Sequence, residues 1–373
     1  MMEFNMKKPS DAKREDFSTK MTDILNYGAL NLAMCIGYRT GLFDVLDEFE
    51  SPRTASDIAS RAGLDTRYVK EWLGIMVCGE IVELTATELA EDVFFLPREH
   101  GDLITRRSGH SNLGVYTQEI PLLTSCAMEP VVTSFYSGEG VDYENYPKFQ
   151  SFMSQLANAK HRQVLVKRFL PSVDDGELVR KLNSGIRVCD LGCAEGIAIM
   201  LMARAFPKSE FFGIDISEEV IQNAKTTTAR EGFRNVNFLR VDGATLKNDR
   251  SLEASFDYVT AFDAIHDQTR PDDALRGVHS ILKPGGLFSM VDIAASSRLS
   301  ENKAHPMGAF LYTVSLMHCM PVGLVNGGLG LGMMWGRQKA VEMLIEAGFK
   351  QVDVLDIPDD PFNLHFLCRK PEP

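Results

Sequence analysis

The chain has 373 residues, with 39 Lys and Arg against 51 Asp and Glu, so its formal net charge is −12. Hydrophobic residues make up 45% and charged residues 24%, which excludes a disordered or collagen-like chain. An acidic chain without a long run of Lys and Arg repels phosphate groups, so we expect neither a nucleic-acid nor a membrane partner. A length above about 250 residues predicts more than one domain.

Seven cysteines, an odd number, lie scattered from Cys35 to Cys368. That distribution does not indicate a disulfide framework, and the N-terminal residues lack the apolar centre of an export signal, so we expect a cytoplasmic protein. Residues 306–336 contain no Lys, Arg, Asp or Glu and are long enough to span a bilayer. Because the stretch also holds Pro321 and several glycines, we expect a buried insertion instead.

The first 100 residues have mainly helical patterns. Apolar spacing predicts a helix over residues 22–49, with Gly37 and Gly41 as breaks. Two shorter helices and a strand come next, and their expected limits are Thr54 or Ser56 as the first cap, Gly63 as the turn, Thr66 as the second cap, Gly79 as the end and Ile81–Leu84 as the strand. Helix, tight turn, helix and strand is the winged-helix arrangement.

A winged helix raises the possibility of DNA binding. Between Arg53 and Leu84 there are four basic and five acidic residues, whereas a recognition helix is normally more basic. We favour a dimerisation or scaffold role for a winged-helix domain over residues 1–100. Residues 101–181 are predicted to form a helical linker or lid region.

Residues 182–373 alternate between strand and helix patterns, which predicts a mostly parallel sheet covered by helices on both faces. The seven expected strands are Arg187–Asp190, Phe211–Asp215, Val236–Val241, Asp257–Phe262, Leu287–Ile293, Gln351–Leu355 and Leu364–Cys368. The expected helices are Ile197–Ala205, Glu218–Glu231, Asp272–Leu282 and Arg337–Ala347. The predicted fold class is therefore α/β, a Rossmann-like seven-stranded sheet preceded by the winged-helix domain.

The turn after the first of these strands has the strongest signal for a ligand. Asp190 ends the strand, a glycine turn runs from Gly192 to Gly196, and a helix begins at once. Asp215 ends the next strand, where a carboxylate can accept hydrogen bonds from two ribose hydroxyls. The dinucleotide and P-loop fingerprints do not fit, because Ala194, Ile197 and the lack of a Lys after Gly196 break both patterns. A nucleoside cofactor with a cationic group is predicted.

The motifs DLGCAEG, GIDIS, RVDGATL, FDYVTAFDAIHD and LKPGG occur one after another in order, and GLFDVL, LDTRYVKEWL and FFLP precede them. In these motifs the chain resembles, over nearly its whole length, the class I S-adenosylmethionine-dependent methyltransferases with an N-terminal winged-helix domain, which are related to small-molecule O-methyltransferases. The resemblance implies S-adenosylmethionine as cofactor and a homodimer formed through the N-terminal domain.

The resemblance also assigns the cofactor contacts. Asp190, Gly192 and Gly196 match residues around the methionine part, Asp215 matches the ribose acid, and Asp242 with Gly243 matches the adenine contact. The full expected set is Asp190, Gly192, Cys193, Ala194, Gly196, Asp215, Ile216, Asp242, Gly243, Phe262 and Asp263. Ala194 stands where the family usually has the middle glycine, and its methyl group is expected to narrow the pocket.

His266 comes after the fourth expected strand, at the end of the sheet where such folds bind ligands, and Asp267 is next to it. The two resemble the His-Asp pair of O-methyltransferases, in which the His deprotonates a hydroxyl. The catalytic prediction is His266 as base or substrate orienter, with Asp267 steering it; a pair that only caps a helix is the alternative.

The long insertion supplies the candidate substrate contacts His305, Tyr312 and His318, although a wall of core residues would have the same pattern. We expect no metal site, because His318-Cys319 and the pair Cys189 and Cys193 lack the paired spacing of common zinc sites.

The predicted function is methylation of a small-molecule acceptor at O, S or N. Two other functions remain open: a winged-helix regulator that senses the cofactor, and a catalytically silent S-adenosylmethionine-binding protein. A nucleic-acid methyltransferase is disfavoured, because FDAIHD replaces the Asn/Asp-Pro-Pro-aromatic run that comes after the fourth strand in enzymes acting on base amines.

Overall fold

The computed structural model describes residues 10–86, 91–358 and 360–372. The chain divides into two compact units, Met1–Pro121 and Leu122–Pro373. The predicted linker over residues 101–181 is shared between these units, and the predicted domain limits at residues 100 and 181 stay predictions.

The first unit consists of helices and a small sheet. Its helices are α1 (Asp11–Thr40), α2 (Leu42–Asp47), α3 (Ala55–Ala62), α4 (Thr66–Cys78) and α5 (Arg98–Ile104), together with the 3-10 helices η1 (Arg106–Ser111) and η2 (Gly114–Gln118). Its strands β1 (Arg53–Thr54), β2 (Glu83–Ala86) and β3 (Asp92–Phe95) form an antiparallel sheet in the order β1-β3-β2. Two helices and then a two-stranded wing confirm the predicted winged helix.

The caps of the two central helices result from short polar side chains. Thr54 accepts from the backbone N–H of Asp57, whose carboxylate accepts in return from Thr54, and Gly63 ends α3 at a φ of 66°. The second cap differs from the prediction: Asp65, not Thr66, accepts from the backbone of Arg67 and Tyr68. A carboxylate at a helix N-terminus also interacts favourably with the helix dipole, which explains why the acid has this role.

The first helix corrects another prediction. Gly41 does break it, with a φ of 77°, but Gly37 lies inside α1. A Cβ at Gly37 would lie 2.3 Å from the ring of Trp72, whose indole N–H donates to the carbonyl of Ala33 at 2.8 Å. Gly37 is therefore a packing residue that lets α4 approach α1 closely, and it is not a helix stop.

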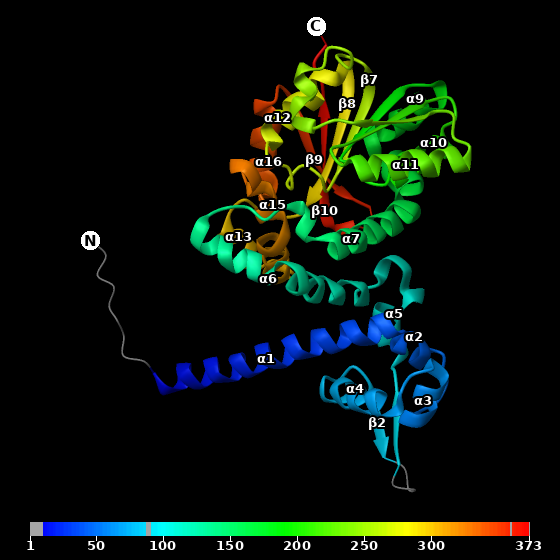
Figure 1. The fold of residues 1–373 in the computed structure, drawn as a ribbon, viewed down its shortest axis with the longest axis vertical. Coiled ribbons are helices and arrows are strands. Elements are labelled where there is room, and N and C mark those ends of the chain that lie inside the picture. The colour runs from blue at the N-terminus through cyan, green and yellow to red at the C-terminus, as the bar shows by residue number, and fades with distance from the viewer. Residues whose placement is uncertain (1–9, 87–90, 359, 373) are drawn as a thin grey trace. The chain divides into compact units, whose positions relative to one another are not determined.

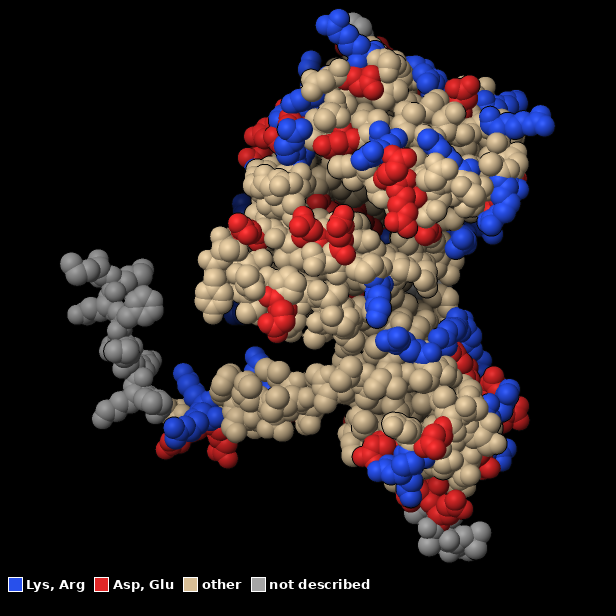
Figure 2. Space-filling view, viewed as in Figure 1, with Lys and Arg blue, Asp and Glu red and all other residues tan. Residues whose placement is uncertain are grey.

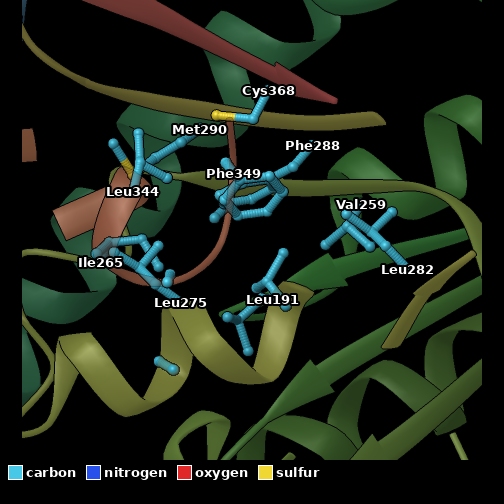
Figure 3. Packing of buried hydrophobic residues seen from close by; sticks show 14 of the residues in the cluster. Leu191, Val259, Ile265, Leu275, Leu282, Phe288, Met290, Leu344, Phe349 and Cys368 are labelled. Carbon is cyan, nitrogen blue, oxygen red and sulfur yellow. The ribbon is translucent and has the colours of Figure 1, made fainter. Parts of the chain in front are cut away.

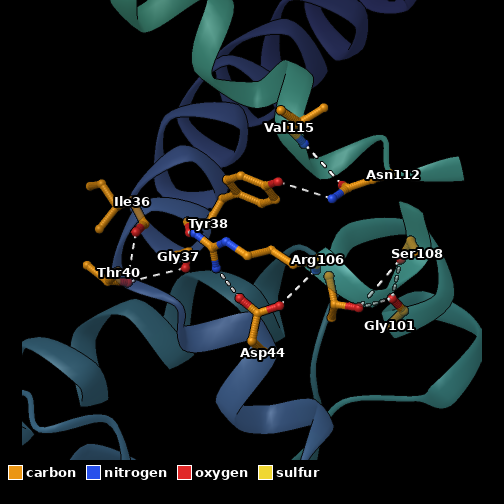
Figure 4. A network of polar contacts seen from close by, with 11 residues as sticks. Ile36, Gly37, Tyr38, Thr40, Asp44, Gly101, Arg106, Ser108, Asn112 and Val115 are labelled. Atoms are coloured by element: carbon orange, nitrogen blue, oxygen red, sulfur yellow. Dashed lines mark hydrogen bonds and ion pairs between the residues drawn. The ribbon is translucent and has the colours of Figure 1, made fainter. Parts of the chain in front are cut away.

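A polar network connects the C-terminal end of α1 and the helix α2 to η1 and the residue after it (Figure 4). Arg106 donates through its backbone and its guanidinium to Asp44, and also to the carbonyl of Tyr38. The side-chain amide of Asn112 donates to the Tyr38 hydroxyl at 3.1 Å. These contacts connect η1 to α1 and α2, which explains why residues 101–121 belong to the winged-helix unit.

The second unit is built on a seven-stranded sheet. Its strands are β4 (Arg187–Leu191), β5 (Glu210–Asp215), β6 (Val236–Arg240), β7 (Phe256–Phe262), β8 (Leu282–Ile293), β9 (Val352–Ile357) and β10 (Asp360–Arg369). They lie in the order β6-β5-β4-β7-β8-β10-β9. Neighbours from β6 to β8 are parallel, whereas β10 is antiparallel to both β8 and β9. The predicted seven-stranded, mostly parallel sheet is confirmed.

Helices cover both faces of this sheet. Those of the second unit, with α6 beginning just before it, are α6 (Glu119–Ser137), α7 (Pro147–Lys160), α8 (Leu170–Ser172), α9 (Glu177–Ser184), α10 (Ile197–Ala205), α11 (Glu218–Glu231), α12 (Pro271–Ile281), α13 (Leu299–Asn302), α14 (Gly308–Val314), α15 (Met320–Leu324) and α16 (Gly336–Glu346). Figure 1 shows α9, α10 and α11 on one face of the sheet and α12 and α16 on the other. Short 3-10 segments are η3 (Tyr143–Asn145), η5 (Val173–Gly176), η6 (Gly243–Asn248) and η8 (Val325–Gly327), and π-helical segments are η4 (His161–Phe169) and η7 (Ser315–Cys319).

The face under α12 and α16 contains a continuous apolar core. Leu275 of α12 and Leu344 of α16 pack with Val259 and Phe288 of the central strands, and Phe349 stacks on Phe288 (Figure 3). Burial of these side chains fixes the sheet between its two helical layers, because apolar area removed from water is the main source of folding free energy. The carboxyl ends of the parallel strands are thereby held at one edge.

The expected insertion forms α13, α14, η7, α15 and η8. The helical run Gly308–Gly327 is long and apolar enough to cross a bilayer by length and composition alone, and 56% of its most apolar window is buried within the protein. Leu311, Val314, Met317 and Val322 are among its buried side chains. Within this unit the insertion lies at the edge of the sheet toward which the arrow of β8 points (Figure 1).

Candidate functional site

The loop between β4 and α10 turns sharply around two glycines. Gly192 and Gly196 have φ values of 73° and 74°. A Cβ at Gly192 would lie 2.6 Å from the side chain of Ala264, and one at Gly196 would lie 2.4 Å from the ring of Phe238. Both positions therefore require glycine for conformation and for space. The backbone N–H groups of Gly192 and Cys193 donate to the carbonyl of Ile214 and hold the loop against β5.

Asp190 is a buried carboxylate at the end of β4. It is 3% exposed, and its Oδ1 accepts from the Thr260 hydroxyl at 2.6 Å. Burial raises the pKa of Asp190 to about 7, although the Thr260 hydrogen bond opposes that rise. A cation placed beside this carboxylate would favour its charged form, so the residue suits a ligand with an ammonium group.

Asp215 holds the other side of the loop. Its Oδ2 accepts from the backbone N–H of Ala194 at 3.1 Å, and its Oδ1 accepts from that of Ser217 at 2.9 Å. Ala194 has a φ of 46°, in the left-handed region that favours glycine. The carboxylate at the end of β5 therefore braces the strained residue of the loop, a contact that sequence spacing does not reveal.

The remaining expected cofactor residues line up along the ends of β5, β6 and β7. Asp242 caps η6 by accepting from the backbone of Ala244, and a Cβ at Gly243 would lie 2.9 Å from the side-chain oxygen of Gln268. Asp263 has a φ of 48° directly after β7, and the ring of Phe262 packs edge-on against His161. Ile216 is 64% exposed, which suits contact with a ligand.

His266 is held by Asp292, a residue that the sequence patterns did not single out. Its Nδ1 lies 2.8 Å from Oδ1 of Asp292, which also accepts from the Trp335 indole and from the backbone of Ile293. Both side chains are buried. Because the carboxylate accepts from Nδ1–H, the ring is fixed in orientation and its Nε2 points away from Asp292.

Asp267 lies on the other side of the ring, with Oδ1 at 3.3 Å from Nε2 of His266. Burial alone would lower the pKa of His266, but the carboxylates of Asp292 and Asp267 outweigh it and raise that pKa well above its ordinary value. The predicted contact between His266 and Asp267 is thus present, and Asp292 is the stronger partner of the two.

The insertion brings two further side chains to this point. Nδ1 of His318 lies 3.9 Å from Oδ2 of Asp267. Atoms of His266, Asp267 and Cys319 that can ligate a metal all lie within 4.8 Å of one another. Burial, and then Asp267, raise the pKa of the Cys319 thiol to about 12. The expectation of no metal site rested on spacing along the chain, which does not detect a cluster formed by distant segments.

Aromatic rings surround His318. Its ring centroid lies 4.7 Å from that of Tyr146, 4.8 Å from that of Phe149 and 5.8 Å from that of Tyr143. Burial lowers the pKa of His318, with Asp267 partly opposing that change, so the imidazole is neutral at neutral pH. Its Nε2 is buried and has no hydrogen-bond partner among the described residues. Such a nitrogen is available to a polar ligand group.

The other two expected substrate residues have local partners. Nδ1 of His305 accepts from the backbone of Met307, and the Tyr312 hydroxyl accepts from the side chain of Asn302. Of the three candidates in the insertion, His318 is the one that the structure places beside Asp267. Asp292 had a detectable signal, since it is a carboxylate near the end of an apolar strand; nothing in the sequence joins Cys319 to His266.

Comparison with known proteins agrees with this geometry. Residues 182–348 match the family described as a methyltransferase domain, and residues 28–106 match the Rv2258c-like winged HTH domain. The matched domain contains the loop after β4 and the acid at the end of β5. The chain therefore contains a methyltransferase domain, built on the seven-stranded sheet that is typical of class I methyltransferases. Enzymes of this class take the methyl group from S-adenosylmethionine.

Individual relatives are distant from this methyltransferase. An uncharacterized methyltransferase of Synechocystis sp. is 30% identical over 115 residues, which cover 30% of this chain and 49% of that protein. Demethylmenaquinone methyltransferase of Geobacillus kaustophilus is 24% identical over 221 residues, covering 56% of this chain and 86% of that protein. This chain thus spans about half the length of the first relative and most of the second.

Similarity to a solved structure extends over both units. The structure of human N-acetylserotonin methyltransferase in complex with SAM has a TM-score of 0.62 and 16% identity, and covers 98% of this chain and 99% of that one. At this identity the likeness establishes the fold of the methyltransferase, a winged-helix unit and then the seven-stranded sheet.

Proposed function

We propose that this methyltransferase binds S-adenosylmethionine at the loop after β4 and methylates a small-molecule acceptor at O, S or N. The observation that carries the proposal is the continuity of the two sites. Ala264, two residues before His266, packs directly against Gly192 of the loop. A methyl donor held by the loop therefore lies next to the His266 and Asp267 pair.

The residues of the loop fit this cofactor. Gly192 is exposed and has no side chain, so the space over the loop stays open to a ligand. Asp190 offers a buried carboxylate for the ammonium group of the methionine part, and Asp215, Asp242 and Gly243 are proposed to contact the adenosine part. Cys193, Ala194, Gly196, Ile216, Phe262 and Asp263 complete the proposed cofactor set. When bound, the cofactor supplies a methyl group that its sulfonium has already activated.

The protein then has to align the nucleophilic atom of the acceptor with this methyl group and exclude water from the site. Asp292 fixes the ring of His266, and Asp267 lies beside Nε2. We propose that this pair orients the nucleophilic atom of the acceptor and assists loss of its proton. His318 with its aromatic neighbours is proposed to bind the acceptor body, with Tyr312 and His305 further along the insertion.

Methyl transfer from labelled S-adenosylmethionine to fractionated cell metabolites tests the function directly, with identification of the labelled product. His266→Ala should lower turnover by about 10²–10⁴-fold, the usual effect of losing an acid–base group, while calorimetric cofactor affinity stays nearly unchanged. Asp215→Ala should instead weaken cofactor binding in the same calorimetric measurement. Transfer at the normal rate by His266→Ala would remove its role, and absence of any labelled product would favour a silent cofactor-binding protein.

The winged-helix regulator is the second candidate function. In α4, the guanidinium of Arg67 pairs with Glu71 one turn later, which leaves this helix little positive charge. Figure 2 shows acidic and basic side chains interspersed over the visible face of the first unit. A gel shift at two ionic strengths distinguishes the functions, since DNA binding that weakens steeply with salt would support a regulator.

Cytoplasmic location and a homodimer through the N-terminal domain belong to the same proposal. The dimer is supported by exposed apolar side chains along α1, including Phe17, Leu25 and Tyr27, which are 61–69% exposed. Exposed apolar surface of this extent on one helix is typical of an interaction site.

A further inference from the structure

Tyr143 is an aromatic residue of the segment that connects α6 to α7 in the second unit. It begins the 3-10 segment η3. The centroid of its ring lies 5.8 Å from that of His318, and Nδ1 of His318 lies 3.9 Å from Oδ2 of Asp267. The ring of Tyr143 therefore stands beside the side chains that are proposed to bind the acceptor.

The backbone around Tyr143 is fixed on both sides of the ring. The backbone N–H of Val141 and the hydroxyl of Tyr146 each donate to a carbonyl of the insertion, at 3.0 Å and 2.9 Å. The carbonyl of Tyr143 accepts from the backbone N–H of Tyr146 at 3.1 Å and from the side-chain amide of Gln150 at 2.5 Å. The fold thus positions this residue before any ligand binds, which lowers the entropy that binding costs.

Water reaches the side chain of Tyr143 although protein surrounds much of it. The residue is 51% exposed, yet burial raises the pKa of its hydroxyl, and the carboxylates of Asp267 and Asp215 raise that pKa further. Asp215 is the proposed ribose acid and Asp267 belongs to the acceptor pair. Tyr143 therefore faces a space that the cofactor site and the acceptor site share.

We propose that the ring of Tyr143 contacts the sulfonium of bound S-adenosylmethionine and distinguishes this charged donor from the neutral product S-adenosylhomocysteine. The inference rests on the proposed function, which places the adenosine part near Asp215 and the acceptor near His266 and Asp267. The sulfonium carries the methyl group that is transferred, so it must lie between the ribose acid and the acceptor. Tyr143 faces that space.

An aromatic ring suits this position because its face attracts a cation. The nearby carboxylates already have partners of their own. Both oxygens of Asp215 accept from backbone N–H groups, and Oδ1 of Asp267 lies 3.3 Å from Nε2 of His266, whose raised pKa keeps that ring positively charged. S-adenosylhomocysteine has lost the positive charge together with the methyl group. It should therefore lose the attraction of the ring and keep the other contacts of the cofactor.

Calorimetric titration of the full chain with S-adenosylmethionine and with S-adenosylhomocysteine tests this contact. Tyr143→Leu keeps an apolar side chain but removes the ring. It should weaken binding of S-adenosylmethionine by about 5–30-fold, the range for a cation on an aromatic face, and change the affinity for S-adenosylhomocysteine by less than about twofold. Tyr143→Phe keeps the face and should resemble the parent protein with both ligands. Tyr136→Leu, at a tyrosine that is 90% exposed on α6, is the matched control and should also resemble the parent protein.

Three outcomes would overturn the inference: unchanged binding of both ligands by Tyr143→Leu, an equal loss for both ligands, or a loss in Tyr143→Phe as large as that in Tyr143→Leu. An equal loss would mean that the ring only packs against the ligand, and a loss in Tyr143→Phe would assign the effect to the hydroxyl. Thermal unfolding curves show whether each variant folds, and Tyr143→Ala is the second variant if Tyr143→Leu does not. A parent protein that binds neither ligand would overturn the proposed function itself, whereas normal binding by the parent with unchanged variants would overturn this inference alone.

Discussion

At the residue scale, the buried carboxyl of Asp190 is expected to make cofactor binding depend on pH. Burial raises its pKa to about 7, so in the free protein at pH 6 most of these carboxyl groups carry a proton. A protonated carboxyl cannot pair with an ammonium group. We therefore predict that cofactor affinity, measured by calorimetry, rises by nearly tenfold between pH 5 and pH 6 and by about fivefold between pH 6 and pH 7. The rise should end near pH 8, where an α-amino group itself loses its proton at about 7.7–8.0.

Thr260→Val provides a second test of the role of Asp190. The Thr260 hydroxyl donates to the charged form of Asp190, so its removal should raise the pKa further and shift the affinity curve to higher pH. Asp190→Asn should remove the dependence altogether. Affinity that stays constant from pH 5.5 to 7 in the parent protein would contradict the role of Asp190.

At the residue scale, positions at strand ends were predictable from the sequence, whereas contacts made by packing were not. Asp190, Asp215, His266 and Asp267 each lie at or just beyond the end of a predicted strand, so the order of the strands was enough to place them at one edge of the sheet. Cys319 reaches His266 only because the insertion folds back over that edge. Contacts of this kind depend on the path of a long connection, which local patterns do not encode.

The loop from Gly192 to Gly196 is the element where local strain can be measured. Ala194 has a φ of 46°, which costs a residue with a Cβ about 1–2 kcal/mol. Ala194→Gly relieves that strain but adds about 0.4–1 kcal/mol of entropy to the unfolded chain. We predict a net stabilisation of about 0.5–1 kcal/mol, measured by denaturant unfolding, together with a wider cofactor pocket.

Gly196→Ala is the contrasting variant in the same loop. Its Cβ would lie 2.4 Å from Phe238, and its φ of 74° is unfavourable for alanine. It should destabilise the protein, so opposite signs for the two variants are expected. Destabilisation by Ala194→Gly would show that the methyl group of Ala194 makes a packing contact worth more than the strain.

The limits of helices were predicted best where an apolar pattern and a capping or turn residue indicated the same position. The expected limits of α10 and α11 are those observed, because an apolar face agrees with a glycine turn before α10 and with the Ser217 cap and Gly232 around α11. Gly37 was misread because a glycine within a helix looks the same in sequence whether it stops the helix or admits a ring. Trp72 decides between these two roles, and it lies on another helix.

At the scale of the whole molecule, the proposed dimer depends on the exposed apolar surface of α1. Leu25 and Tyr27 are each 69% exposed on this helix, and Figure 1 shows the N-terminal half of α1 clear of the other helices of its own unit. We predict that the protein is a dimer by light scattering coupled to size-exclusion chromatography. The double variant Leu25→Asp with Tyr27→Asp should be monomeric, because it places charges on the apolar surface.

Leu299→Asp is the matched control for this test. Leu299 is 70% exposed on α13 of the second unit, so its substitution changes the same chemistry on a different surface and should leave the dimer intact. A parent protein that is monomeric at all concentrations tested would contradict the proposal.

The hydroxyl of the buried Tyr146 donates to the carbonyl of Met317, and the backbone N–H of Val141 donates to that of Pro321. These two bonds fasten the segment before α7 to the helix that presents His318 and Cys319. Displacing either segment would break these hydrogen bonds, so we expect the two segments to move together when a ligand enters or leaves.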